Sequence, residues 1–114
     1  MLDKFLSMME LKESDLKEWL RPVEDPDLGM PLLELGLIYE AKPVEKVDGK
    51  HNVHVKMTLT SPGCPAAGYL VEQIRKRMEE HPQVKECKVE LVWDPKWDPK
   101  TMASDEAKEE LGIW

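Results

Sequence analysis

The sequence predicts an α+β fold of two layers, in which helices pack on one face of a small sheet of about three strands. The chain has 114 residues, enough for one compact domain with its own core. Apolar residues recur at helical spacing over 14–23 and 65–81, and they alternate with polar residues over 52–60 and 84–93. The order helix, hairpin, helix, strand, helix therefore predicts a single domain over residues 12–114.

The amino-terminal part is predicted to contain one well-defined helix. Residues 1–11 have apolar side chains at helical spacing but no cap, which indicates a lead-in that forms a short or frayed helix. A helix follows with Ser14 as its N-cap and Pro22 near its end. Residues 24–31 contain two prolines, a glycine and three acids, which is typical of a turn. The apolar side chains of the helix are Leu16, Trp19, Leu20 and Val23.

Residues 37–60 are predicted to form a β-hairpin. The first strand, 37–47, is interrupted by Pro43, which indicates an edge position or a bulge. Asp48 and Gly49 predict the tight turn. Over 52–60 the side chains alternate, so Val53, Val55, Met57 and Leu59 are predicted to face one way and His54, Lys56, Thr58 and Thr60 the other, solvated way.

The second half of the chain continues with a helix over 65–81, which Pro65 begins because a first helical residue needs no N–H partner. A third strand is predicted over 84–93, with Cys87 in phase with Val89, Leu91 and Trp93 and therefore a buried structural thiol. Two Trp-Asp-Pro-Lys repeats predict a proline-stiffened strap. A last helix over 104–111 is closed by Gly112.

The composition argues against several kinds of partner. Lys and Arg number 16 against 23 Asp and Glu, a net charge of −7, whereas binders of nucleic acid or anionic membranes need clustered basic residues. We therefore expect no nucleic-acid and no membrane partner. Two cysteines are too few for a disulfide framework. The first ten residues do not resemble a signal peptide, and no stretch approaches the roughly 18 apolar residues of a membrane span, so a cytoplasmic protein is expected.

Cys64 is the strongest candidate for chemistry. If Pro65 begins the helix, Cys64 occupies the N-cap, where the helix dipole and unpaired N–H groups favour a thiolate. A thiolate there could ligate a soft metal or attack an electrophile. A second interpretation stays open, in which Cys64 is a small cap of ordinary reactivity.

Four further side chains are candidates for the same site. Thr58 and Thr60 belong to the strand that leads into the loop of Cys64, so their hydroxyls could approach it; alternatively, they are ordinary strand residues on a solvated face. Asp25 and Asp27 could cap a helix or lend carboxylates to a pocket.

Four segments form a recognisable set in this order and spacing. They are Glu-Asp-Pro-Asp-Leu at 24–28, Glu-Leu-Gly-Leu-Ile-Tyr at 34–39, Met-Thr-Leu-Thr-Ser-Pro-Gly-Cys-Pro at 57–65, and a closing segment over 97–112. Together they resemble the SufT/PaaD-like family of metal–sulfur cluster biosynthetic proteins, which is associated with the SUF pathway. The threonine-rich run that ends in Gly-Cys-Pro is the most specific part, and the resemblance extends over residues 19–112.

The resemblance implies a fold similar to other iron–sulfur cluster assembly domains. It also implies a non-enzymatic accessory factor in iron–sulfur cluster assembly or in the maturation of iron–sulfur proteins, acting as carrier or adaptor through Cys64. The functional positions of the family correspond to Asp25, Thr58, Thr60 and Cys64, and to Asp27, where the family commonly has Glu. The implied partners are the iron–sulfur assembly machinery and client apoproteins.

A stably bound cofactor is not expected. Iron–sulfur clusters usually need four protein ligands, mostly cysteine thiolates, and Cys64 supplies one. Cys64 is therefore expected to ligate a transient iron–sulfur cluster at most, shared with a partner or with the second subunit of a homodimer.

Two other classes of function remain open. A thiol-dependent enzyme would use Cys64 as nucleophile with His54 or Asp25 assisting, although the spacing specifies no Cys–His pair. A pure protein-interaction module would bind through the open edge of the sheet or through the strap between Trp93 and Trp97.

Overall fold

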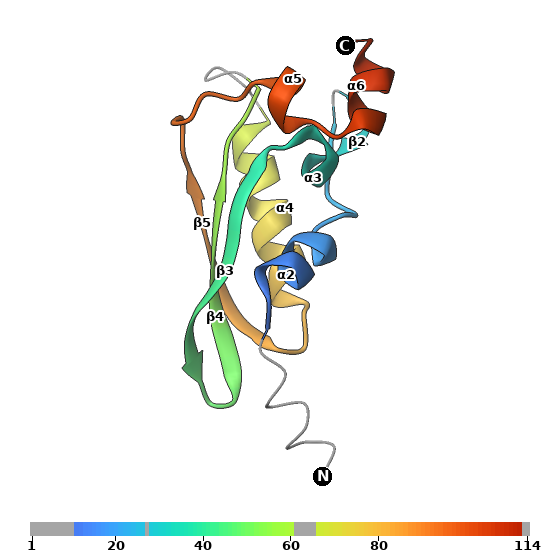
Figure 1. Cartoon of the computed structure of the whole chain (residues 1–114). Helices are drawn as coiled ribbons and strands as arrows, with labels where there is room; N and C mark the ends of the chain where they lie inside the picture. Colours follow the sequence, from blue (N-terminus) through green and yellow to red (C-terminus); the bar gives the residue numbers. More distant parts are fainter. Residues whose placement is uncertain (1–10, 27, 61–65, 113–114) are drawn as a thin grey trace.

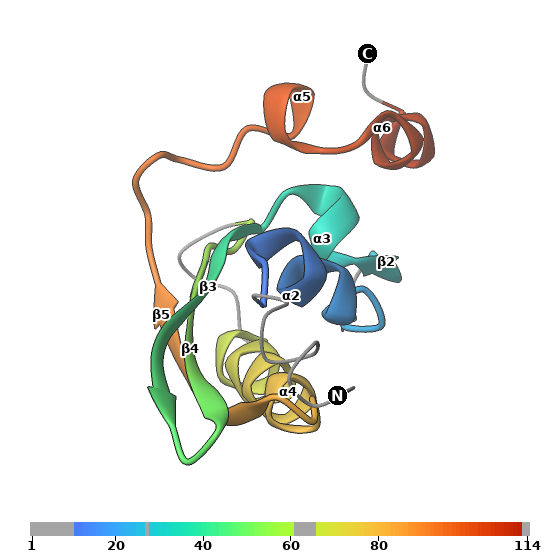
Figure 2. The same cartoon turned by 60° about the horizontal axis from the view of Figure 1, so that its bottom comes forward.

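The computed structural model describes residues 11–26, 28–60 and 66–112. The elements in chain order are α2 (Glu13–Trp19), β1 (Glu24–Asp25), β2 (Met30–Pro31), α3 (Leu32–Leu35), β3 (Ile38–Val47), β4 (Lys50–Met57), α4 (Ala67–Glu79), β5 (Val84–Leu91), α5 (Pro99–Met102) and α6 (Asp105–Leu111). Helix α2 lies against β3 and α4 against β5, on one face of the sheet, while α3, α5 and α6 gather toward one end (Figures 1 and 2). The predicted two-layer α+β fold is confirmed.

The main sheet has the strand order β3-β4-β5. β3 and β4 form the predicted antiparallel hairpin, and Asp48 and Gly49 have φ values of 52° and 80°, as a type I′ turn requires. Pro43 lies in an outer strand beside a register irregularity, also as predicted. β4 and β5 run parallel, with α4 as the connection between them. The end of β4 and the start of α4 therefore lie toward the same end of the molecule (Figure 1).

The core lies between the sheet and the helices. Val53, Val55 and Met57 of β4 are buried, which confirms the alternation predicted for this strand. Cys87 of β5 is also buried, at 7% exposure, as predicted. The helical layer contributes five side chains with 0% exposure to this core. They are Leu16 of α2, Leu20 directly after α2, and Leu70, Ile74 and Met78 of α4.

Several predicted boundaries are wrong by one or two residues. Ser14 is not an N-cap, because α2 begins at Glu13 with Lys12 in the cap position. Helix α4 begins at Ala67 and ends at Glu79. After it, the hydrogen bonds span three residues instead of four, as in the bond from the His81 N–H to the Met78 carbonyl, 3.0 Å. The predicted lead-in helix lies outside the described residues except for residue 11, which is buried.

Other differences follow from tertiary contacts. The segment predicted as a turn contains the two-residue strands β1 and β2, which pair with each other. The helices α3 and α5, of four residues each, are shorter than any periodicity can reveal. β5 ends at Leu91, so Trp93 is 45% exposed rather than in phase with the buried residues. Helix α6 is confirmed, with Ser104 accepting a helix N–H at 3.1 Å and Gly112 at φ 70°.

Reciprocal hydrogen bonds join α2 to α4. The Trp19 indole N–H donates to the Arg77 carbonyl and the Arg77 Nε–H donates to the Trp19 carbonyl, each at 2.8 Å. The guanidinium lies 3.8 Å from the centre of the indole ring, and His81 meets the same ring edge-on at 4.6 Å. Burial lowers the pKa of His81 below its usual 6.5, the Arg77 charge lowers it further, and the Asp15 carboxylate opposes both.

This cluster predicts a loss of stability in mild acid. Because the pKa of His81 is lower in the folded chain than in the unfolded chain, its contribution to stability is present above about pH 6.5 and is lost as the pH falls below it. We expect thermal unfolding of the His81→Gln variant to depend less on pH than that of the wild type between about pH 7.5 and about pH 5.5. The His51→Gln variant, outside the cluster, should behave as the wild type; equal pH dependence in His81→Gln and the wild type would contradict this.

Candidate functional site

Two of the predicted site residues lie at the start of the connection between β4 and α4. Thr58 and Thr60 follow β4 directly, and α4 begins at Ala67. Cys64, between them in the sequence, lies outside the described residues, as does Asp27. The sequence predicted Cys64 as the N-cap of this helix, but Ala66 occupies that position, two residues after Cys64 in the sequence. The N-cap of α4 therefore gives no reason to expect a thiolate at Cys64.

Thr58 is buried, at 1% exposure, although the alternation predicted it on the solvated face. The strand ends at Met57, and the Thr58 N–H donates to the Leu37 carbonyl at 2.8 Å. Its hydroxyl oxygen has no hydrogen-bond partner of standard geometry in the described part of the chain. Thr60, by contrast, is exposed. A buried hydroxyl with an unused hydrogen bond costs about 1–3 kcal/mol, which marks Thr58 as an unusual position.

Tyr39 is a neighbour of Thr58 that the sequence did not single out. Its hydroxyl donates to the Pro95 carbonyl at 2.7 Å, joining β3 to the strap. Burial raises the pKa of Tyr39, the Thr58 hydroxyl beside it acts in the opposite direction, and the Asp94 carboxylate adds to the rise. Tyr39 belongs to the 34–39 segment of the resemblance, but its position beside Thr58 depends on the tertiary structure.

Asp25 is 4% exposed and lies on β1. Its side chain accepts the Leu28 N–H at 3.1 Å and its carbonyl accepts the Gly29 N–H at 2.7 Å, so it shapes the turn between β1 and β2. It also lines a pocket of about 600 Å³ together with Tyr69 and Gln73 of α4. Asp25 therefore combines a turn-forming role with a position in the wall of a pocket.

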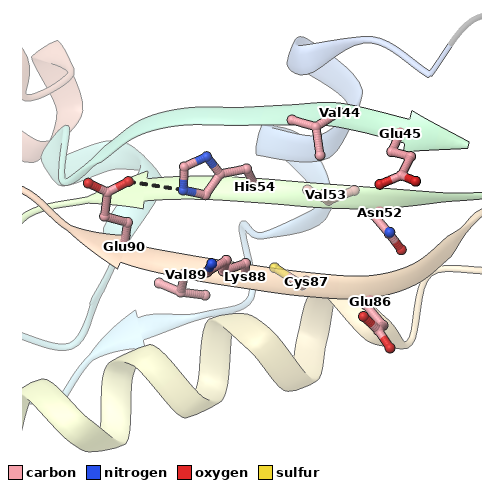
Figure 3. Close-up of a pocket in the computed structure, with 10 residues that line it drawn as sticks. All are labelled: Val44, Glu45, Asn52, Val53, His54, Glu86, Cys87, Lys88, Val89 and Glu90. Atoms are coloured by element: carbon pink, nitrogen blue, oxygen red, sulfur yellow. Dashed lines mark ion pairs between the residues drawn. The ribbon is translucent and has the colours of Figure 1, made fainter.

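His54 is not oriented toward these residues. It lies on the outer, helix-free face of the sheet, where its Nε2 is 3.1 Å from a Glu90 carboxylate oxygen, in a shallow pocket of about 750 Å³ (Figure 3). Thr58 is four positions further along the chain, roughly 13 Å away for an extended segment. The pairing of His54 with Glu90 gives no support to its role as the base of a thiol enzyme.

Metal-binding groups do not gather within the described ranges. Over 11–26, 28–60 and 66–112, no three His, Cys, Asp or Glu side chains lie close enough to hold a metal ion. Burial raises the pKa of the Cys87 thiol to about 12; the Glu79 carboxylate adds to the rise and Arg75 opposes it. Cys87 is therefore protonated and unreactive near neutral pH.

No helix in the described part of the chain has both the length and the apolar character needed to cross a membrane.

The fold and the sequence of its connections define a class: a small α+β domain with an acidic turn between β1 and β2, and with two threonines and one cysteine in the sequence between β4 and α4. Within that class, the chain belongs to the iron–sulfur cluster assembly protein family, whose profile matches residues 13–91.

Similar proteins agree with this assignment. The Fe-S protein maturation auxiliary factor YitW of Bacillus subtilis is 40% identical, over 93% of this chain and 99% of that one. The Fe-S protein maturation auxiliary factor SufT of Staphylococcus aureus is 38% identical, over 80% and 98%. A solved domain of unknown function, DUF59, from Bacillus anthracis is 38% identical, with a TM-score of 0.76 over 90% and 92%. The resemblance to SufT-like proteins is confirmed.

Proposed function

We propose that this protein is a non-enzymatic accessory factor in the maturation of iron–sulfur proteins and that it acts through Cys64. The observation that carries the proposal is its similarity, at 38–40% identity over 80–93% of the chain, to two proteins named as auxiliary factors in that process. Its partners are then the iron–sulfur assembly machinery and client apoproteins, and its place of action is the cytoplasm.

The chemistry of the thiols supports Cys64 as the contact with iron–sulfur clusters. The chain has two cysteines, and the buried Cys87 stays protonated, so it is not available as a thiolate ligand. One thiolate cannot complete the four ligands that a cluster usually needs. The cluster is therefore cargo rather than a resident group, and its remaining ligands come from a partner or from the second subunit of a homodimer.

The polar residues around this connection have supporting roles in the proposal. Thr58 has a buried hydroxyl with hydrogen-bonding capacity to spare, which suits a donor to a sulfur ligand. Asp25 holds the turn that faces α4, and Asp27 belongs to the same acidic segment. Thr60 is exposed at the start of the loop, where a partner can reach it.

Loss of function in Cys64→Ser is the test of this proposal. Because the exchange replaces one sulfur atom with oxygen and keeps the size of the side chain, we expect the variant to unfold at nearly the wild-type denaturant concentration and to lose client maturation. The Cys87→Ala variant is the matched control and should keep client maturation, since its thiol is buried. Retention of client maturation in Cys64→Ser would refute the proposal.

Anaerobic reconstitution with iron and sulfide separates a carrier from an adaptor. About one cluster per dimer in the wild type, and none in Cys64→Ser, would support a carrier with Cys64 as ligand. No cluster in either protein, together with loss of client maturation in Cys64→Ser, would support an adaptor that contacts the assembly machinery or its clients.

A further inference from the structure

Each outer strand of the main sheet is contacted by a glutamate from a helix. β3 and β5 are the outer strands, and such strands present backbone N–H and C=O groups that can pair with another chain. Glu13, the first residue of α2, accepts the Ala41 N–H of β3 at 3.0 Å. Glu79, the last residue of α4, accepts the Cys87 N–H of β5 at 3.1 Å. The two helices that cover the sheet therefore each contribute a carboxylate at one of its edges.

Apart from these glutamates, the two edges differ in the features that discourage pairing with another strand. β3 contains Pro43 and two register irregularities, which discourage pairing, whereas exposed lysines occur on both strands, Lys42 and Lys46 on β3 and Lys85 and Lys88 on β5. β5 contains no proline, and its register with β4 is regular from Glu86 to Leu91. In place of a proline or a bulge over these residues, the β5 edge has the Glu79 carboxylate on its Cys87 N–H.

We propose that Glu13 and Glu79 close the edges of the sheet, and that the β5 edge, without Glu79, pairs with β5 of a second copy of this chain. This inference is independent of the function proposed for Cys64.

The pattern of charges on β5 identifies a second copy as the occupant. Glu86 and Lys88 face the outer side of the sheet, since they pair with the outward residues Asn52 and His54 of β4. In an antiparallel pair, directly opposite side chains lie on the same face. If Cys87 of one copy stands opposite Cys87 of the other, Glu86 of each copy faces Lys88 of the other. This alignment forms two opposite-charge pairs.

Arg75 forms an ion pair with Glu79, and its second partner, Glu72, provides a control. The Arg75 Nη1 lies 2.7 Å from Glu79 Oε1, which leaves Oε2 to accept the Cys87 N–H. Arg75 pairs in the same way with Glu72, which lies on the helix surface, 56% exposed. Removal of Glu72 therefore disturbs the same ion-pair network without affecting the edge of the sheet.

The first test compares the masses of Glu79→Ala, Glu72→Ala and the wild type in solution, by light scattering after size-exclusion chromatography over a wide range of concentrations. We expect Glu79→Ala to reach twice the wild-type mass as concentration rises, and Glu72→Ala to match the wild type. If circular dichroism shows Glu79→Ala to be unfolded, Glu79→Met keeps the length of the side chain but lacks the carboxylate, and the same outcomes apply. A wild-type mass for the folded variant at every concentration would overturn the proposal.

The second test checks the partner and the register. Adding Lys88→Glu to Glu79→Ala places like charges opposite each other, so the mass should return to that of the wild type. Adding Glu86→Lys as well restores the opposite pairs, so the doubled mass should return. If neither exchange changes the mass of Glu79→Ala, pairing of β5 with its own copy in this register is wrong.

Discussion

Replacing Gly36 with alanine is expected to reduce the free energy of unfolding by about 2–5 kcal/mol. Gly36 ends α3 with φ 78°, a left-handed conformation that costs about 1–2 kcal/mol for alanine. A Cβ atom at this position would also lie 2.6 Å from the carbonyl carbon of Met102, which belongs to backbone and cannot move as a side chain would. Since small domains have about 5–15 kcal/mol in total, the variant should be close to unfolding at room temperature.

Urea unfolding of Gly29→Ala provides the control for this prediction. Gly29 has a similar φ of 65°, but an added Cβ meets nothing within 4 Å. Gly29→Ala should therefore lose only the conformational part, about 1–2 kcal/mol. Equal losses in the two variants would show that the contact between α3 and α5 is not tight.

The two tryptophans of the Trp-Asp-Pro-Lys repeat are expected to differ strongly. Trp97→Ala should lower the free energy of unfolding by about 3 kcal/mol, because the ring packs against the core and its N–H donates to the Leu35 carbonyl at 2.7 Å. Trp93→Ala removes a ring that is 45% exposed and should cost within about 1 kcal/mol. Chemical denaturation of both variants measures the difference.

A similar loss of unfolding free energy in both tryptophan variants would contradict the packing of Trp97 against the core and the exposed position of Trp93. The difference also bears on the interaction-module alternative. Trp97 holds the strap to the domain, so a defect in partner binding in Trp97→Ala would report on folding as well as on contact. Trp93 is the residue through which the strap can be tested as a binding surface, because its loss leaves the packing of Trp97 in place.

Local patterns were sufficient for much of the fold. The alternation around Val55 identified a half-buried strand, and positive φ at Asp48 and Gly49 confirmed the turn that these residues predicted. Pro43 indicated an edge strand, and Ser104 with Gly112 marked both ends of the last helix. These features depend on interactions within a few residues, which a sequence displays directly.

The candidate site was predicted less completely. The resemblance selected Asp25, Thr58 and Cys64, but the period of β4 placed Thr58 on the solvated face. β4 ends at Met57, and Thr58, whose N–H donates to the Leu37 carbonyl, is buried beside Tyr39. That bond joins residues 21 positions apart in the sequence, so no local pattern contains it.

The sequence by itself determined the α+β class, the order of the major helices and strands, the burial of Cys87 and the family. Only the tertiary structure decided that β5 runs parallel to β4, that Trp97 packs inward while Trp93 does not, and that Glu79 lies on the β5 edge. The physical reason is that alternation is the same for parallel and antiparallel strands, and two identical tetrapeptides have the same local preferences. Their surroundings differ only after distant segments have packed against them.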